Sequence, residues 1–296
     1  MTTGNSDMHS GTIKTEIRSL RDIEPEKVID AFEEAFSDYA VSFDRREIKA
    51  MLVRRGFCRD LSFAAFDGDR IAAFTLNGIG VYDGDKTAYD CATGTIASYR
   101  GRGLAAAIFR HSLPELRRAG VSRYLLEVLQ TNTPAIAVYR KNGFGICAEY
   151  DCYNQSISAL NLDRPYPEEI GIRPAGIGEV EKMADAADFM PSWQNSLESV
   201  SRGIEGLLVK GAYAGERCVG CCVADPLTGD ITQIAVDSGW RRRGIGSALM
   251  KAVSEDMKSD RVKVLNIDTQ CRSMSGFLKA INMAEGLKQF AMSREI

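Results

Sequence analysis

The stretch Ser98-Tyr99-Arg100-Gly101-Arg102-Gly103-Leu104-Ala105 returns later in the chain as Gly239-Trp240-Arg241-Arg242-Arg243-Gly244-Ile245-Gly246. Both copies carry the pattern aromatic-R-x-x-G-x-G/A, follow an apolar run and precede an amphipathic helical run. Glycines let the backbone approach a ligand closely, and the free N–H groups at a helix start attract anions. The repeat therefore predicts two anion cradles, each within its own copy of one fold.

The length and charge of the chain restrict its class. Its 296 residues are enough for two domains, since a typical domain has about 100–150 residues. A net charge of −3 excludes the strong basic field that non-specific nucleic-acid binding requires. The first residues lack the apolar core of a signal peptide, and no apolar run reaches the roughly 18 residues of a membrane span. We expect a cytoplasmic protein without nucleic-acid or membrane partners.

The cysteines are interpreted as reduced thiols. The chain has 8 of them, and Cys218 and Cys221 have the spacing of a metal or redox pair. No second such pair exists, and His9 and His111 are the only histidines. Residues 217–224 are also apolar and typical of a strand, which favours buried thiols over metal or redox use. No metal is expected.

The order of elements predicts two α+β domains, each a mixed and mostly antiparallel sheet flanked by helices. We expect a tail over residues 1–14, a first domain over 15–160, a linker rich in proline and charge over 161–169, and a second domain over 170–296. After the first glycine loop the pattern predicts a helix over 104–118, a strand over 123–129 and a helix over 134–141. Residues 144–156 are predicted as two strands, or one strand and its return. The interval from Arg100 to Tyr124 nearly matches that from Arg241 to Val264, which supports the repeat.

Two other phosphate-binding motifs resemble the loops in part. The run from Gly101 through Gly103 to Ala106, with Glu127 further on, nominally fits a dinucleotide fingerprint. The second loop has Leu249 at the third glycine position, however, and both loops follow hairpins instead of opening a βαβ unit. A P-loop would need G-x-x-x-x-G-K-S/T, and neither copy has that lysine.

An acyl-CoA site fits the residues better. Arg100-x-x-Gly103-x-Ala105 and Asn132-x-x-Ala135-x-x-x-Tyr139-x-x-x-Gly143-Phe144 match two separate signatures, and the chain resembles the GNAT superfamily of acyl-CoA-dependent N-acetyltransferases. The resemblance covers about residues 15–157 well and about 170–296 more loosely. It implies two tandem GNAT-like domains, and acetyl-CoA as the co-substrate whose diphosphate lies on the loop at the helix start.

The resemblance also implies which residues hold the cofactor. In the first half the strand end, the loop and a helix cap are expected to do so: Thr95, Ile96, Ala97, Arg100, Gly101, Arg102, Gly103, Leu104, Ala105 and Asn132. In the second half the corresponding residues are Val236, Arg241, Arg243, Gly244, Ile245 and Gly246. Asn132 could equally serve only as the helix N-cap.

Tyr139 is the candidate general acid. The departing CoA thiolate needs a proton or a hydrogen bond, and a phenol with its ordinary pKa of about 10 can donate one. The competing interpretation is that Tyr139 only packs with Ala135 and Phe144. Glu127, on the strand that leads to the site, is the candidate general base.

Other side chains are weaker candidates for the same site. Asp90 and Asp38 could act as the base instead of Glu127. An acceptor would approach between the first two helices and the hairpins, where Tyr39, Phe43 and Tyr82 could line its pocket. Aromatic residues at such spacings also fit a core.

The second half departs from the catalytic signature. Phe277 is predicted to stand in the place of the tyrosine, and no tyrosine follows Tyr213. Ser273, Ser275 or Cys271 could donate a proton instead. Tandem members of the superfamily can have one working half, so we expect the first half to be catalytic and the second to be degenerate.

The predicted function is transfer of an acetyl group from acetyl-CoA to a primary amine of a small molecule or peptide. The alternative is a non-enzymatic acyl-CoA-binding or regulatory protein with two CoA pockets. Neither the acceptor nor the oligomeric state follows from the sequence, because substrate pockets do not follow from the fold.

Overall fold

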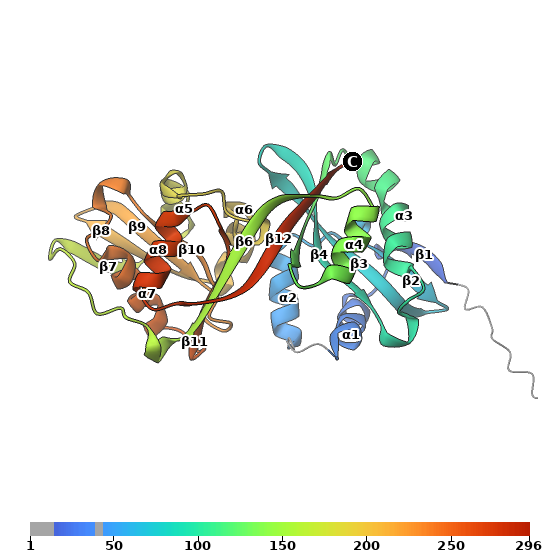
Figure 1. Cartoon of the computed structure of the whole chain (residues 1–296), viewed down its shortest axis with the longest axis horizontal. Helices are drawn as coiled ribbons and strands as arrows, with labels where there is room; N and C mark the ends of the chain where they lie inside the picture. Colours follow the sequence, from blue (N-terminus) through green and yellow to red (C-terminus); the bar gives the residue numbers. More distant parts are fainter. Residues whose placement is uncertain (1–14, 39–43) are drawn as a thin grey trace, which may run out of the picture.

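The computed structural model describes residues 15–38 and 44–296 (Figure 1). Tyr39 and Phe43, predicted to line an acceptor pocket, lie outside these residues. The first half, residues 15–160, contains β1 (Glu16–Ser19), α1 (Pro25–Phe36), α2 (Arg45–Arg54), β2 (Phe63–Asp67), β3 (Arg70–Tyr82), β4 (Asp85–Thr95), α3 (Leu104–Arg118), β5 (Arg123–Leu129), α4 (Thr133–Lys141) and β6 (Gly145–Ser156).

The second half, residues 161–296, repeats this order. It contains β7 (Ile170–Pro174), α5 (Ile177–Met183), α6 (Leu197–Gly203), β8 (Leu208–Ala214), β9 (Arg217–Ala224), β10 (Ile231–Val236), α7 (Ile245–Glu255), β11 (Arg261–Asp268), α8 (Arg272–Ala280) and β12 (Ala284–Glu295). Among the described strands every ladder is antiparallel except β4 with β5. The predicted fold class is confirmed.

The halves exchange their last strands. The larger sheet has 8 strands in the order β1-β2-β3-β4-β5-β12-β6-β11, and the smaller has 4 in the order β10-β9-β8-β7. In Figure 1, β6 and β12 cross between the two bodies, and the C-terminus lies beside the first half. Of the residues 144–156, Gly145–Ser156 form one strand, β6, and both strands that pair with it, β11 and β12, come from the second half.

The sheet of the first half has a different helical layer on each face. Tyr124, Leu126 and Val128 of β5 pack in one apolar cluster with α3 and α4. Leu125, between them, packs in another cluster with α1 and α2. Since successive strand side chains point to opposite faces, α3 and α4 cover one face of β5, while α1 and α2 lie beyond the other.

The exchange predicts that the first half does not fold alone. The boundaries at 160 and 170 stay predictions, but a fragment ending at residue 160 leaves β5 without the β12 residues Gln289–Glu295 that pair with it. An exposed unpaired strand edge promotes aggregation. We expect this fragment to elute as aggregate in size-exclusion chromatography, whereas the full chain elutes as a defined species. A monodisperse, folded fragment would contradict the prediction.

Candidate active site

The first glycine loop forms a cradle of free backbone donors. Gly101 and Gly103 have φ values of 77° and 72°, and α3 begins directly afterwards. The N–H of Arg100 donates to Ala97 and that of Ala107 to Gly103. Among the hydrogen bonds of the described residues, none is donated by the backbone of residues 101–106. These donors, at the positive end of a helix, suit a diphosphate.

The second loop repeats this geometry at α7. Its left-handed residues are Arg242 and Gly244, with φ values of 62° and 83°. Arg241 donates its backbone N–H to Ser238 and Ala248 donates to Gly244, while residues 242–247 donate no backbone hydrogen bond within the described chain. The two cradles are therefore copies in structure as well as in sequence.

The first arginine of each loop braces it to neighbouring elements. Arg100 donates from Nε to the Thr95 carbonyl at 3.0 Å and from Nη2 to the Ala35 carbonyl at 2.9 Å, and it also pairs with Asp38. Arg241 makes the matching contacts, to the Val236 carbonyl at 2.8 Å, to the Ala186 carbonyl at 2.9 Å and to Asp188. Both guanidinium groups hold the loop's own architecture. A direct contact with the cofactor stays a prediction for them.

The other predicted loop residues are of two kinds: buried apolar side chains and arginines that lie beside an aromatic ring. Leu104 and Ile245 are buried and fix the helix starts. Arg102 lies 5.3 Å from the ring centre of Tyr99, and Arg243 lies 5.1 Å from that of Trp240. At the preceding strand end Ile96 is buried, and its N–H donates to the Ala72 carbonyl at 3.0 Å. These contacts hold each cradle in place between a strand end and a helix.

The strands in front of each loop diverge. β4 and β5 pair only over Thr87–Tyr89 and Arg123–Leu125. In the second half, a single bridge joins Asp230 to Lys263 between β10 and β11. Beyond these contacts the described residues of the two strands in each pair do not hydrogen-bond to each other, although the carbonyl groups of Thr95, Val236 and Leu265 accept from side chains. The predicted strands of the pantetheine site, around Thr95 and Val236, are those that diverge.

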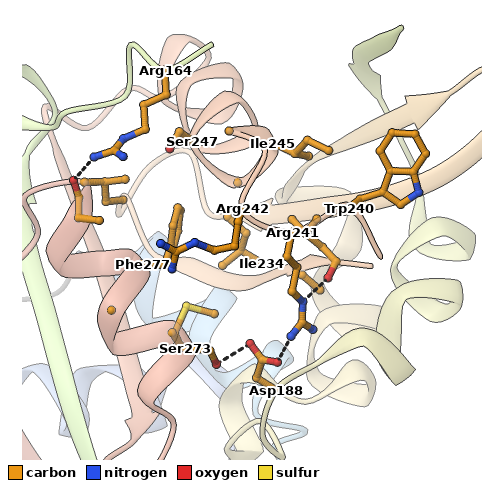
Figure 2. Close-up of a pocket in the computed structure, with 18 of the residues that line it drawn as sticks. Arg164, Asp188, Ile234, Trp240, Arg241, Arg242, Ile245, Ser247, Ser273 and Phe277 are labelled. Atoms are coloured by element: carbon orange, nitrogen blue, oxygen red, sulfur yellow. Dashed lines mark hydrogen bonds and ion pairs between the residues drawn. The ribbon is translucent and has the colours of Figure 1, made fainter. Parts of the chain in front are cut away.

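A cavity of about 290 Å³ opens beside the second loop. It lies between α7 and α8, and its wall includes Val236, Arg242, Gly246 and Phe277 (Figure 2). A Cβ atom on Gly246 would lie 3.1 Å from the Phe277 ring. The absence of a side chain at Gly246 therefore keeps this cavity open at the helix start.

A second cavity, of about 550 Å³, adjoins the first. Asp188, Ile234, Ala235 and Met274 belong to both walls. β10 also carries a bulge between Ile231 and Gln233 at the second cavity. The cavity at the cradle and the chamber on the side of α5 and α6 therefore lie next to each other along β10.

The corresponding side of the first half is filled by the second half. The Trp193 ring stacks on Tyr89 of β4, with ring centres 5.2 Å apart and planes 5° from parallel. Its indole N–H donates to the Arg55 carbonyl at 3.0 Å, and its side chain is only 1% exposed. Tyr82, predicted to line an acceptor pocket, donates to the Pro191 carbonyl at 2.8 Å.

Glu127 lies under the same segment. Tyr89 Oη donates to its Oε2 at 2.9 Å, and Gln194 Nε2 donates to the same oxygen at 3.2 Å. Burial raises the pKa of Glu127, although Arg55 and several hydrogen bonds oppose this. Its partners join it to the second half, and its role as a general base stays a prediction.

Tyr139 and Asp90 meet at the divergence of β4 and β5. Tyr139 is partly buried, packs against Phe144 at 5.7 Å between ring centres, and hydrogen-bonds the Asp90 carboxylate. Thr93 Oγ1 also donates to Asp90 at 2.8 Å. Burial raises the pKa of Asp90 to about 6, while these two hydroxyls and Arg55 lower it. The packing of Tyr139 on Phe144 is therefore present, and its role as the general acid stays a prediction.

The raised pKa of Asp90 predicts a pH effect on stability. Between about pH 4 and pH 6 the folded chain keeps a proton that the unfolded chain has lost, so this group's contribution to stability falls as pH rises and is constant above that range. Asp90→Asn removes the titration. The unfolding free energy of the variant relative to wild type should therefore rise from pH 4.5 to 6.5 in urea titrations and then level off. Asp69→Asn, in an exposed turn, is the control. If the unfolding free energies of Asp90→Asn and wild type differ by the same amount at every pH, Asp90 does not have a raised pKa in the folded chain.

The register of α8 corrects one prediction. The described helices α4 and α8 have the same length, begin after Asn132 and Cys271, and end before the left-handed residues Gly143 and Asn282. This register puts Leu278, not Phe277, at the place of Tyr139. Leu278 is fully buried, whereas Phe277 lines the smaller cavity. The predicted equivalence is wrong by one residue because the second helix lacks the asparagine and the tyrosine that mark these positions in the first.

Polar side chains still line this end of the second half. Figure 2 shows Ser273 donating to Asp188, at 2.7 Å, and Asp188 pairing with Arg241. Cys271, at the cap of α8, lies 3.4 Å from Ser273 through its sulfur. In the first half Asn132 caps α4 by accepting the Ala135 N–H at 3.3 Å. Its N-cap role is therefore present, and its contact with pantetheine stays a prediction.

Two cysteines of β9, Cys221 and Cys222, are buried thiols, whereas Cys218 is only partly buried. Burial raises the pKa of both Cys221 and Cys222. Across residues 15–38 and 44–296, no group of three or more His, Cys, Asp or Glu side chains could hold a metal ion. Over the same residues no helix is long and apolar enough to cross a bilayer.

The fold and its loops define a duplicated α/β protein with two anion cradles at helix starts, each beside diverging strands. The acetyltransferase (GNAT) family matches residues 26–144 and 178–275. The chain therefore belongs to the acetyltransferase (GNAT) family, a match that includes both loops.

Individual relatives are distant. Mycothiol acetyltransferase of Corynebacterium glutamicum strain R is 37% identical over 62 residues, which make up 21% of this chain and 21% of that protein. The [Ribosomal protein bS18]-alanine N-acetyltransferase of Escherichia coli K12 is 34% identical over 86 residues, or 29% of this chain and 55% of that protein. A tandem GNAT protein from the clavulanic acid biosynthesis pathway shares the fold with a TM-score of 0.72 at 15% identity, over 95% of this chain and 98% of that one. These similarities support the tandem family and leave the acceptor open.

Proposed function

We propose that this chain transfers an acetyl group from acetyl-CoA to a primary amine of a small molecule or peptide, and that the transfer takes place in the second half. The observation that carries the proposal is that the two cavities adjoin and share the wall residues Asp188, Ile234, Ala235 and Met274. A cofactor groove must open onto space for an acceptor, and on the first half Trp193 occupies the equivalent face.

The residues of the second cradle fit acetyl-CoA. Backbone N–H groups of residues 242–247 would hold the diphosphate, with Arg242 and Arg164 in the same wall supplying positive charge. When bound, acetyl-CoA supplies a thioester whose carbonyl carbon accepts the amine and whose sulfur leaves. Thr232, the extra residue of the β10 bulge, has a backbone that lacks regular ladder partners and faces the chamber. Its N–H is our candidate for polarising the thioester carbonyl.

The second half carries out this chemistry without a tyrosine. An ordinary thiol has a pKa of about 8.5, so a thiolate is a fair leaving group near neutral pH. The largest contribution of the chain to the reaction rate is then to hold the thioester and the amine next to each other in the right orientation. Ser273, which lines the cofactor groove, is the hydroxyl available to the leaving sulfur.

A second location for the same reaction is the first half. The hydrogen bond between Tyr139 and Asp90 favours it, because Tyr139 as general acid would stand where β4 and β5 separate. Acceptor entry there would require Trp193 and Gln194 to leave Glu127 and Tyr89. We rank this location second on that ground.

The function is tested by the release of free CoA thiol. Purified protein is incubated with acetyl-CoA and a panel of primary amines, and we expect release that depends on the amine and yields the acetylated product by mass spectrometry. Saturable acetyl-CoA binding in calorimetry with no release across the panel would overturn the proposal. That result would favour the non-enzymatic acyl-CoA-binding alternative.

A further inference from the structure

The chamber next to the cofactor groove is built by both halves. Val81, Tyr82 and Asp83 at the tip of the β3–β4 hairpin contribute one wall, and α5, α6, β10 and β11 contribute the others. The proposed function directs the acceptor into this chamber, so any assignment of the acceptor rests on that function. The chemistry of the walls then decides which amines fit.

The charged side chains of the chamber are all acidic. Asp83, Glu181, Asp188 and Glu198 line it, and among its described lining residues there is no lysine, arginine or histidine. The arginines that pair with these carboxylates lie outside the chamber's lining. Arg241 pairs with Asp188, Arg202 pairs with Glu198 at 2.8 Å, and Arg123 pairs with Asp83 at 3.9 Å. Glu181 has no ion pair or side-chain hydrogen bond in the described part of the chain. The chamber therefore presents negative charge to its occupant.

The carboxylates lie at two ends of the chamber. Asp188 bonds Ser273 and Arg241, which belong to the cofactor groove. Glu198 accepts the Val81 N–H at 3.1 Å, so it lies at the hairpin end. A carboxylate therefore lies both beside the hairpin and beside the cofactor groove, where each can attract an ammonium group.

A buried acceptor atom gives an independent indication. Asn195 lines the chamber and is only 5% exposed. Its Nδ2 donates to the Leu265 carbonyl at 3.0 Å, which fixes the amide, while its Oδ1 has no hydrogen-bond partner in the described residues. A buried oxygen without a partner is costly and favours an N–H donor. A primary amine supplies such a donor.

Most of the remaining wall is apolar, and its polar side chains all donate to backbone carbonyl groups: Tyr82, Ser196, Ser201, Thr232 and Gln233. Met183, Met190 and Met274 line it together with Phe189, Leu197 and Val264. Methionine side chains adapt to the shape of an apolar occupant and contact aromatic rings favourably. The acceptor body therefore meets hydrocarbon and thioether surface, with polar contacts confined to its amine.

We propose that the acceptor is an apolar primary amine that enters as a cation and carries no carboxylate, with an aromatic or branched aliphatic body. The ammonium gives one proton to water, and the neutral nitrogen attacks the thioester carbonyl carbon. The new C–N bond forms as the C–S bond breaks, and the second nitrogen proton ends on the departing sulfur. A carboxylate on the acceptor would be repelled by Asp188 and Glu198.

The test compares phenethylamine with phenylalanine, which share the ring and differ by one carboxylate. In the intact protein, kcat/KM for acetylation should be at least tenfold higher for phenethylamine. Glu181→Gln and Glu198→Gln should each lower this ratio, whereas Glu205→Gln, an exposed glutamate outside the chamber, should leave it unchanged. Thermal melts check that each variant is folded. Glu198→Gln loses the ion pair with Arg202 and could be unstable, but Glu181→Gln breaks no ion pair among the described residues and is sufficient for the test.

The outcomes separate this inference from the proposed function. Turnover with phenylalanine equal to or above phenethylamine overturns the acceptor class and leaves the function standing. Absence of turnover with every amine overturns the function. In that case calorimetry of phenethylamine still decides the inference, because binding weakened by Glu181→Gln supports the cationic chamber, and absent or unaltered binding overturns it.

Discussion

Replacing Gly246 with valine is expected to lower kcat/KM for acetyl transfer by roughly 100-fold, the scale of loss that a misplaced reactant causes. Gly246 is the second residue of α7, and any Cβ there would lie 3.1 Å from the Phe277 ring across the cofactor groove. Valine adds two further methyl groups, which occupy the space beside the cradle. Acetyl-CoA affinity by calorimetry should fall along with turnover measured by thiol release.

Ala105→Val is the matched control. Ala105 is the second residue of α3, as Gly246 is of α7, so the same side chain enters the corresponding place in the other loop. If the second half carries the reaction, Ala105→Val and Tyr139→Phe keep most of the turnover. If these two variants abolish it while Gly246→Val does not, the reaction belongs to the first half and our assignment is wrong. Thermal melts of all three variants exclude unfolding as the cause.

The loops were predictable because their information is local. The φ values of Gly101, Gly103 and Gly244 meet a requirement for left-handed backbone at positions that the sequence marks with glycine. The predicted helix over 104–118 and the strand over 123–129 match α3 and β5 in both bounds. Short-range turn chemistry and periodicity determine such elements, so a single sequence is sufficient.

The partners of the last strands were not predictable. Nothing within residues 144–156 shows that β12, more than a hundred residues later, is the strand that pairs with them. The two halves have similar elements, and either copy could accept either strand. The choice depends on the packing of the whole chain, which a pattern in one segment does not contain.

Which of the two halves has room for an acceptor depends on the same kind of long-range contact. The sequence placed a tyrosine in one half and none in the matching helix of the other, and this favoured the first half. The structure adds that Trp193 from the second half stacks on Tyr89 of the first, while a large chamber borders the second half's groove. A tyrosine signature reports on proton donation, whereas acceptor space depends on which distant segment lies against the sheet.

Trp193→Ala is expected to lower the unfolding free energy by about 3–5 kcal/mol, the usual cost of truncating a buried large aromatic side chain. The indole is 1% exposed, stacks on Tyr89 and donates to the Arg55 carbonyl. Its loss leaves a cavity and removes one hydrogen bond from that oxygen, which keeps the weaker donor Cys91 Sγ at 3.7 Å. Urea unfolding at constant pH measures the change. Trp240→Ala, which removes the chain's other tryptophan, should cost less than half as much, because Trp240 is only partly buried.

Trp193→Phe separates the two contributions of the indole to this junction. Phenylalanine keeps a ring against Tyr89 but has no N–H for the Arg55 carbonyl, so it should recover most of the stability and leave a deficit of about 1 kcal/mol for the lost hydrogen bond. Tyr89→Ala should then cost less in the Trp193→Ala background than in the wild type, by about 0.5–1.5 kcal/mol, the contribution of the stack. The buried ring of Tyr89 and its hydrogen bond to Glu127 are lost in both backgrounds. Equal losses from Tyr89→Ala in the wild-type and Trp193→Ala backgrounds would mean that the stack contributes nothing, and that the second half covers the first without stabilising it there.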